Sequence, residues 1–182
     1  MKQNESLALY VGRLALTLLL ITAVVAAALA GVNAITKDKI AAAQQEKANQ
    51  AMKEVLPGYE GYAACGFTGS ETVKNVYLPA GGDGTAYVVE VAPNGFGGEI
   101  VMMVGIADGK VTGVAVVSQA ETAGLGAIVA DKTEKGISFR SQFNEKSGQL
   151  TVGKEIEAIT GATITSKAVT DGVNAALAVE LG

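Results

Sequence analysis

Hydroxyl side chains cluster in the segment Glu157-Ala158-Ile159-Thr160-Gly161-Ala162-Thr163-Ile164-Thr165-Ser166, where four of them fall within seven residues. The sequence after this cluster places apolar residues at helical spacing, so the cluster is expected to be a loop that leads into a helix. The apolar positions of that helix are Val169, Val173, Ala176 and Leu177. Backbone N–H groups at the start of a helix, with the positive end of its dipole, favour a phosphate or another anion. Lys167 adds a positive charge to the same turn.

Two interpretations of this cluster are open from its composition. One is a site for a phosphorylated ligand, whose phosphate can also be esterified to a threonine hydroxyl. The other is a plain Ser or Thr N-cap, in which the hydroxyl only accepts a hydrogen bond from the first turn of the helix. Capped helices are far more common than phosphate sites, so composition by itself favours the cap.

The motif Thr160-Gly161-Ala162-Thr163 resembles the Ser/Thr-Gly-Ala-Thr motif at which a flavin transferase attaches FMN to the last threonine through a phosphoester bond. It is similar to the motif in the G subunit of the Rnf electron-transport complex and in the C subunit of the sodium-translocating NADH:quinone oxidoreductase. In that family an acidic residue, usually Asp, stands six positions before the acceptor, and here Glu157 holds that position. The resemblance implies that Thr163 carries covalent FMN. The cofactor-binding residues it implies nearby are Thr160, Gly161, Ala162, Thr165, Ser166 and Lys167.

A second segment, Glu121-Thr122-Ala123-Gly124-Leu125-Gly126, resembles the Glu-Thr-Pro-Gly-Leu-Gly loop of the same family, with Ala123 in place of the usual proline. Its two glycines let backbone amides approach a flat ligand closely. We expect Leu125 to lie against the isoalloxazine ring and Glu121 or Thr122 to hydrogen-bond its edge. The predicted cofactor-binding residues here are Glu121, Thr122, Gly124, Leu125 and Gly126. Without the first motif, a simple glycine-rich loop would be the favoured interpretation.

Two other glycine-containing segments are predicted to be structural. Gly95-Phe96-Gly97-Gly98 resembles a glycine-aromatic turn of the same family, but Ile100 stands where a dinucleotide-binding motif needs its last glycine. Residues 148–154 have the spacing of a phosphate-binding loop, but Glu155 stands where Ser or Thr must bind magnesium. The first segment is therefore expected to be a turn, and the second is rejected as a phosphate site.

Composition excludes several kinds of chemistry. Histidine is absent, which removes histidine bases and histidine metal ligands. Cys65 is the single cysteine, so no disulfide within the chain and no four-cysteine cluster can form. A formal net charge of -4 argues against nucleic acid as a partner. We therefore predict no catalytic residue and no metal site in this chain.

The N-terminal region contains a long apolar run. No charged side chain occurs in residues 14–36, and roughly 20 apolar residues are enough for a helix to span a bilayer. A cleavable signal peptide is the competing interpretation, because Ala28-Leu29-Ala30 resembles a small-residue cleavage site. The length of the run favours a membrane anchor. Lysine and arginine near its ends show no clear bias, so the orientation is implied by the resemblance alone: a cytoplasmic N-terminus, a single pass and a domain on the extracytoplasmic side.

The rest of the chain divides into a helical stretch and a β-rich region. Residues 36–56 are rich in helix formers and stop at Pro57-Gly58, which predicts a helical stalk that acts as a spacer. Three runs rich in β-branched residues follow at 86–91, 100–106 and 111–117, with an Asp-Gly hairpin signal between the last two. We predict an α+β fold with an antiparallel sheet and flanking helices.

These predictions combine into one hypothesis with two alternatives. The predicted regions are a transmembrane segment (1–35), the stalk (36–58) and an FMN-binding domain (59–182). The resemblance implies a membrane-anchored electron carrier of an Rnf-type ferredoxin:NAD oxidoreductase. Its implied partners are the other subunits, among them a second membrane subunit with covalent FMN, as well as the lipid bilayer and a flavin transferase. The alternatives are a C-type subunit of a sodium-pumping NADH:quinone oxidoreductase and an anchored extracytoplasmic binding domain without a cofactor.

Overall fold

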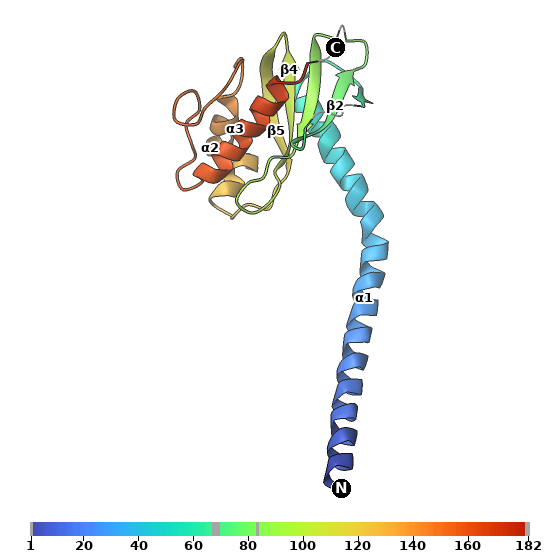
Figure 1. Cartoon of the computed structure of the whole chain (residues 1–182). Coiled ribbons are helices and arrows are strands. Elements are labelled where there is room, and N and C mark those ends of the chain that lie inside the picture. The colour runs from blue at the N-terminus through green and yellow to red at the C-terminus, as the bar shows by residue number, and fades with distance from the viewer. Residues whose placement is uncertain (1, 67–69, 83, 181–182) are drawn as a thin grey trace. The chain divides into compact units, whose positions relative to one another are not determined.

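The computed structural model describes residues 2–66, 70–82 and 84–180. The chain forms two compact units, residues 1–45 and residues 46–182. Helix α1 (Lys2–Val55) makes up the first unit and contributes its last turns to the second. The strands and the remaining helices belong to the second unit, which we call the head (Figure 1).

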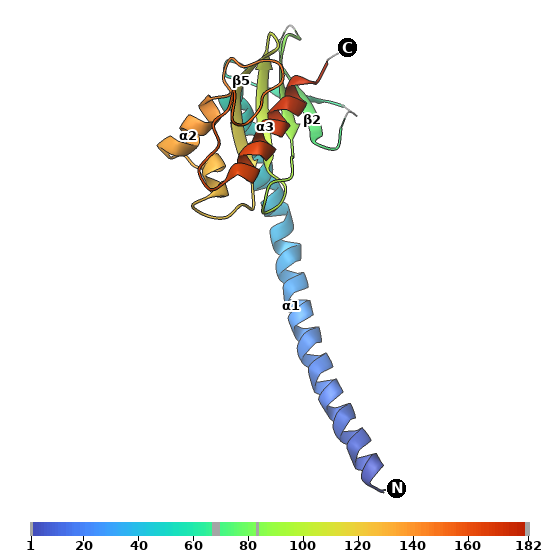
Figure 2. The same cartoon turned by 60° about the vertical axis from the view of Figure 1, so that its left-hand side comes forward.

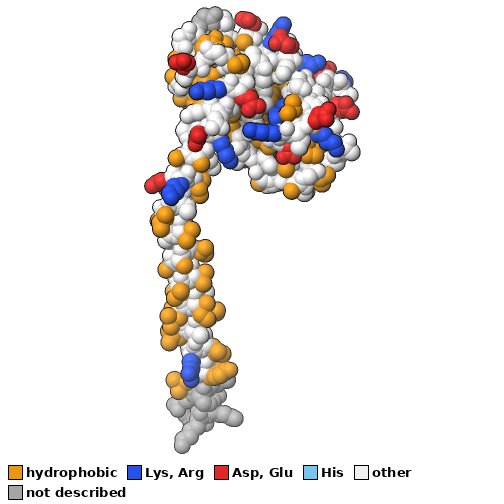
Figure 3. All heavy atoms as spheres, turned by 180° about the vertical axis from the view of Figure 1, so that it is seen from behind, with side chains coloured by type: hydrophobic (Ala, Val, Ile, Leu, Met, Phe, Trp, Pro, Cys, Tyr) orange, Lys and Arg blue, Asp and Glu red, His pale blue; other side chains and the backbone are white. Residues whose placement is uncertain are grey.

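The first unit is an apolar helix whose described side chains are exposed, except for the half-buried Thr36. Within the described chain, the segment Leu9–Val55 of α1 is the one helix long and apolar enough to cross a membrane, and its most apolar window has a mean hydropathy of 2.5. Hydrophobic side chains line its visible face in Figure 3. The Thr17 and Thr36 hydroxyls donate to carbonyls four residues earlier, at 2.8 Å each, so they are satisfied without water. The predicted long apolar N-terminal helix is confirmed.

The head contains a five-stranded antiparallel sheet in the order β1-β2-β3-β4-β5. Its strands are β1 (Tyr62–Cys65), β2 (Val73–Pro79), β3 (Ala86–Val91), β4 (Val101–Ala107) and β5 (Lys110–Ser118). The three predicted runs match β3, β4 and β5 to within one residue. Asp108 (φ 51°) and Gly109 (φ 72°) both have positive φ between β4 and β5, as a tight hairpin turn requires. The predicted antiparallel sheet and α+β fold are confirmed.

Both faces of the sheet are covered, as Figures 1 and 2 show. On one face lie the 3₁₀ helix η1 (Gly126–Ala130) and the helices α2 (Glu134–Ser141) and α3 (Thr163–Leu177). Val89 in β3 is fully buried beneath these helices, with Val169 and Val173 of α3 in the same cluster. Val88, the neighbour of Val89, is fully buried on the opposite face against the end of α1. Alternate residues of the central strands therefore serve two separate cores.

The last turns of α1 are part of the head's core. Met52 and Val55 are almost completely buried in the cluster that contains Val88. Gly105 in β4 and Gly113 in β5 are paired across the sheet, and a Cβ atom on Gly105 would lie 2.5 Å from the Val55 carbonyl oxygen. The expectation that this stretch is only a spacer is therefore wrong at its C-terminal end. The glycine pair makes the room that lets the helix backbone rest on the sheet.

Replacing Gly105 with alanine should destabilise the head by about 2 kcal/mol, because the added methyl group forces the α1 backbone away from the sheet. Thermal unfolding of the full chain, followed by circular dichroism, measures the change. Gly66→Ala is the matched control, since a Cβ atom at Gly66 would meet nothing within 4 Å. Equal midpoints for the two variants would contradict this view of the contact.

A polar cluster lies on β2 and β3 at the face where α1 packs. The Tyr77 hydroxyl and the Asn75 amide both donate to Glu90 Oε2, at 2.9 and 2.8 Å. Partial burial, followed by the hydrogen bond to Glu90 and the charge of its carboxylate, raises the pKa of Tyr77 from 10.0 to about 12. The folded head therefore holds this phenolic proton more tightly than the unfolded chain does.

Stability should consequently fall as the pH rises from 10.0 to about 12, because the unfolded chain loses the Tyr77 proton first. The contribution is fully present below pH 10.0 and is lost as the pH passes through the folded pKa. We expect Tyr77→Phe to show a shallower decline of the unfolding midpoint over this range. If the unfolding midpoint declined equally steeply with pH in the variant and in the unaltered chain, the Tyr77–Glu90 contact would have no part in this pH dependence.

Candidate functional site

Helix α3 begins at Thr163, inside the hydroxyl cluster, whereas the apolar stripe predicts a helix after Ser166. Its N-cap is Ala162, whose side chain makes no capping hydrogen bond. Gly161, with φ 79°, turns the chain into the helix. The structure therefore lacks the Ser or Thr N-cap that composition favours. The first turn of a 15-residue helix presents its backbone N–H groups without a side-chain cap, beside the exposed Thr163.

A buried carboxylate joins three segments around this helix start. Glu121 is 8% exposed. Its Oε1 accepts from the Gly97 backbone N–H at 2.8 Å, and its Oε2 accepts from the Thr165 hydroxyl at 2.5 Å. The same residue thereby holds the turn at 95–98 against the first turn of α3. Both carboxylate oxygens are engaged within the protein, so of the two predicted hydrogen-bonding partners for a flavin edge, the exposed Thr122 is the one the geometry favours.

Glycines leave the space that this arrangement needs. A Cβ atom on Gly126 would lie 2.5 Å from Glu121 Oε2 and 2.6 Å from the Thr165 hydroxyl oxygen. A Cβ atom on Gly97 would overlap the Ala120 carbonyl oxygen. The two glycine-rich segments that the sequence singles out therefore pack against each other through Glu121, and side chains at these positions would separate them.

The segments enclose an apolar cavity of about 230 Å³ beside Thr163. Its lining comprises Phe96, Glu121, Thr122, Leu125, Gly126, Gly161, Ala162, Thr163, Ile164 and Thr165. Three large apolar side chains at the cavity stay exposed to solvent: Phe96 by 70%, Leu125 by 45% and Ile164 by 56%. Exposed apolar side chains gathered around a few polar groups indicate a binding surface for a ligand with an apolar body.

The predicted site residues do not all meet in this cavity. Ser166 is buried and structural, since its hydroxyl donates to the Ala162 carbonyl at 2.9 Å and accepts from the Ile159 N–H at 3.0 Å. Thr160 and Gly124 line a neighbouring cavity of about 700 Å³ instead. Lys167 is exposed and lines a third cavity, beside residues 149–152. The other predicted residues of both motifs line the Thr163 cavity.

Phe96 and Ile164 are candidate site residues that the sequence motifs do not single out. Phe96 belongs to the turn that is predicted to be structural, and Ile164 follows the expected acceptor threonine. An exposed aromatic residue inside a glycine turn is the signal that points to Phe96. Ile164 lies four residues before the buried Ala168, so helical spacing would have predicted that its side chain is buried in the core. The structure shows instead that it lines the cavity and is exposed.

The arrangement suits FMN in three respects. The uncapped helix start provides backbone donors and a favourable dipole for a phosphate. The exposed Thr163 hydroxyl lies at that start, where a phosphoester can form. The apolar cavity beside it can receive one face of a flat ring. The described residues contain no group of three or more Cys, Asp or Glu side chains placed to hold a metal ion.

Comparison with known proteins gives matches over both units. Residues 95–178 match the family described as FMN-binding domain, and residues 10–55 match the one described as RnfG N-terminal region. The G subunit of the Na⁺-translocating ferredoxin:NAD⁺ oxidoreductase complex of Acetobacterium woodii is 36% identical, over 92% of this chain and 90% of its own. The G subunit of an ion-translocating oxidoreductase complex of Methanosarcina acetivorans is 34% identical, over 88% and 89%. The G subunit of the proton-translocating ferredoxin:NAD⁺ oxidoreductase complex of Clostridium ljungdahlii is 45% identical, over 57% and 58%.

Proposed function

The chain belongs to the family of G subunits of Rnf-type ion-translocating oxidoreductase complexes, and from this premise we propose that Thr163 carries its FMN covalently as an electron carrier between ferredoxin and NAD⁺. The observation that supports Thr163 most strongly is its place as the exposed first residue of the uncapped helix α3. When bound, FMN supplies the redox chemistry, and the chain supplies binding and orientation.

Attachment at Thr163 requires a flavin transferase. A phosphoester bond would form between the Thr163 hydroxyl oxygen and the phosphorus next to riboflavin in an activated donor such as a flavin dinucleotide. The bond from that phosphorus to the nucleotide part would break, the nucleotide would leave, and the hydroxyl proton would pass to solvent or to the leaving group. The backbone N–H groups of the first turn of α3 stabilise the charge that the phosphate keeps. The buried Thr165 is less suited to this reaction, because its hydroxyl is held by Glu121.

The apolar side chains at the cavity would hold the flavin ring. Leu125, Phe96 and Ile164 line the cavity and would exclude water from one face of the ring, and Thr122 would offer a hydrogen-bonding group to its edge. Gly126 leaves the space in which Glu121 and Thr165 meet behind the cavity, and the positive φ of Gly161 turns the chain into α3 at its rim. Glu121 acts as a positioning residue, since it fixes the 95–98 turn relative to α3.

In-gel fluorescence of the denatured chain tests the attachment. A chain produced together with a flavin transferase should keep flavin fluorescence in denaturing gel electrophoresis, and a chain produced without it should not. Fluorescence that disappears on denaturation would show non-covalent binding.

The same experiment separates this function from that of a cofactor-free binding domain. The match of residues 95–178 to FMN-binding domains disfavours that alternative. The match of residues 10–55 favours a G subunit over a C-type subunit.

Membership of this family places the chain in a membrane-associated complex of several subunits. We further propose that one neighbour is a second membrane subunit with covalent FMN and that the head lies on the extracytoplasmic side. Covalent attachment is useful there, because free FMN is scarce outside the cytoplasm and a dissociated cofactor would be lost.

The single cysteine provides a test of this orientation. Cys65 is exposed on β1 of the head. A maleimide reagent that does not cross membranes should therefore label it in intact cells. A Cys65→Ser, Gln3→Cys variant is the matched control and should react only after permeabilisation. The reverse pattern would place the head in the cytoplasm.

A further inference from the structure

The outer edge of the sheet at β5 is paired over only part of its length. Val111 exchanges backbone hydrogen bonds with the loop at 145–146, at 2.8 and 2.9 Å. Past that point two adjoining cavities follow the strand, one of about 280 Å³ beside residues 112–114 and one of about 400 Å³ beside residues 115–117. Both are lined by Glu54 and Arg140, so the two cavities adjoin at these residues, and we call them together the β5-edge groove.

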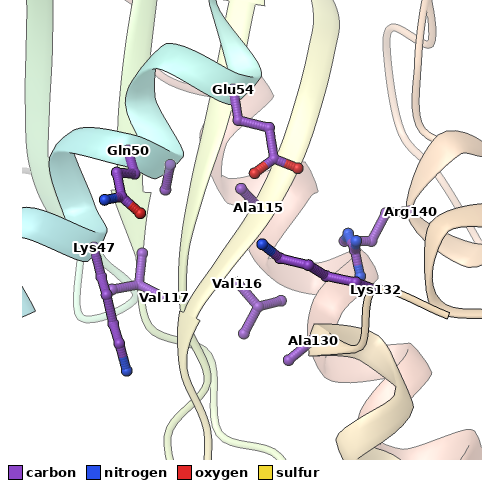
Figure 4. A pocket seen from close by; sticks show the side chains of 10 residues that line it. Lys47, Gln50, Glu54, Ala115, Val116, Val117, Ala130, Lys132 and Arg140 are labelled. Atoms are coloured by element: carbon purple, nitrogen blue, oxygen red, sulfur yellow. The ribbon is translucent and has the colours of Figure 1, made fainter.

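The walls of the groove come from two different parts of the head. One wall is the last turns of α1, and the other is formed by the end of η1 and by α2 (Figure 4). Arg140 is fixed in its wall, because its Nη1 donates to the carbonyl oxygens of Val129 at 2.7 Å and Asp131 at 3.0 Å. The groove is therefore held open by packed elements of the head.

The groove is positively charged in a chain whose net charge is -4. Lys47, Lys132 and Arg140 line it with Glu54 as the one acidic residue, and Figure 4 shows Glu54, Lys132 and Arg140 directed into the same space. Burial lowers the pKa of Arg140, and the charges of the Glu54 and Asp131 carboxylates act in the opposite direction. A guanidinium stays charged at neutral pH. Among the described residues the direct salt bridges are Lys74–Glu99 and Lys110–Glu145, so the cations of the groove form none, although Glu54 and Asp131 lie near enough to act on Arg140.

The backbone at this edge also has bonding capacity. A sheet edge presents N–H and C=O groups that can pair with another strand, and soluble proteins normally block such an edge. Within the described residues, β4 is the sheet neighbour of β5, and outside the sheet backbone bonding to β5 is confined to Val111. A small anion could neutralise the cations of the groove, but it would not pair with the strand edge, whose free backbone groups would stay with solvent. An extended polypeptide satisfies both.

We infer that the β5-edge groove is a docking site for an extended acidic segment of another subunit, which adds to the sheet beside residues 113–117. Its backbone pairs with the edge of β5, and its carboxylates lie against Lys47, Lys132 and Arg140. The contact would fix the head to its neighbour on the side away from β1, since β1 and β5 are the two ends of the sheet. The inference uses membership of the complex and does not depend on FMN.

Hydrogen exchange in the assembled complex tests the inference. Amides of residues 113–117 should exchange more slowly by about tenfold or more in the purified complex than in the full chain alone in detergent. Amides of β1 serve as the internal reference at the other edge of the sheet. Equal exchange rates for residues 113–117 in the two samples would overturn the proposal.

A carbodiimide crosslinker, which joins amines directly to carboxylates, identifies the occupant. In the complex, Lys132 or Lys47 should become linked to an acidic peptide of another subunit, and Lys47→Glu with Lys132→Glu should abolish that link and reduce the protection of residues 113–117. Lys154→Glu is the matched control, since Lys154 is exposed and lies outside the groove. Protection that persists after both charges are reversed, or a groove filled by lipid instead of polypeptide, would contradict the proposal.

Discussion

Replacing Thr163 with alanine should reduce covalent flavin from one FMN per chain to none. The substitution removes the single hydroxyl that lies exposed at the first residue of α3. The fold should be unaffected, because the Thr163 side chain is exposed and alanine is a good helix former. Flavin absorbance of the denatured chain gives the stoichiometry, and circular dichroism reports the fold.

Thr160→Ala is the matched control for this experiment. Thr160 is also exposed and lies three residues earlier, but it faces the neighbouring cavity. It should keep the full flavin content. If flavin instead survived in Thr163→Ala and disappeared in Thr160→Ala, the attachment site would move to Thr160.

Replacing Glu121 with alanine should have the largest effect on stability, about 3 kcal/mol. The change leaves the part-buried Gly97 N–H and the buried Thr165 hydroxyl without their partner, and hydrogen bonds to charged groups contribute roughly 1.5–3 kcal/mol each. Because the 95–98 turn then separates from α3, we also expect a lower yield of flavinylated chain. Chemical denaturation measures the first effect and flavin stoichiometry the second.

Two further variants separate the positioning role from loss of charge. Glu121→Gln keeps an acceptor for Gly97 and a donor that Thr165 can accept, so it should recover most of the flavin content. Glu99→Ala removes an exposed ion pair with Lys74 near the same turn and should change stability by less than about 1 kcal/mol. Equal losses for Glu121→Ala and Glu99→Ala would contradict the role assigned to Glu121.

The sequence predicts best those features that depend on local signals. The β4–β5 hairpin follows from Asp108-Gly109, which can adopt positive φ, and the apolar N-terminal helix follows from a long uncharged run. The predicted stripe of α3 is also correct for Val169, Val173 and Ala176, which are fully buried, whereas Leu177 packs against the same core but is only partly buried. Strand β1 lies at the edge of the sheet and has three of its four residues exposed, so its sequence lacks the alternation of buried and exposed residues that would predict a strand.

Features that depend on contacts between distant segments could not be predicted. Glu121 lies 24 residues from Gly97 and 44 from Thr165, so its role as a link between them appears only when all three meet. The end of α1 could be predicted only as a spacer, because the glycine pair on which it packs, Gly105 and Gly113, lies some 50 residues later in the chain. Lys167 shows a second limit. Its place in the first turn of α3 is a local feature, but that place does not determine which cavity its side chain lines.

Intact mass of the denatured chain, followed by peptide mapping, tests the central proposal most directly. The chain should be produced with a flavin transferase, so that modification can occur. We predict a mass increase equal to one esterified FMN, located on the peptide that contains Thr163. An unmodified mass under these conditions, or a modification on a peptide without Thr163, would contradict the assignment.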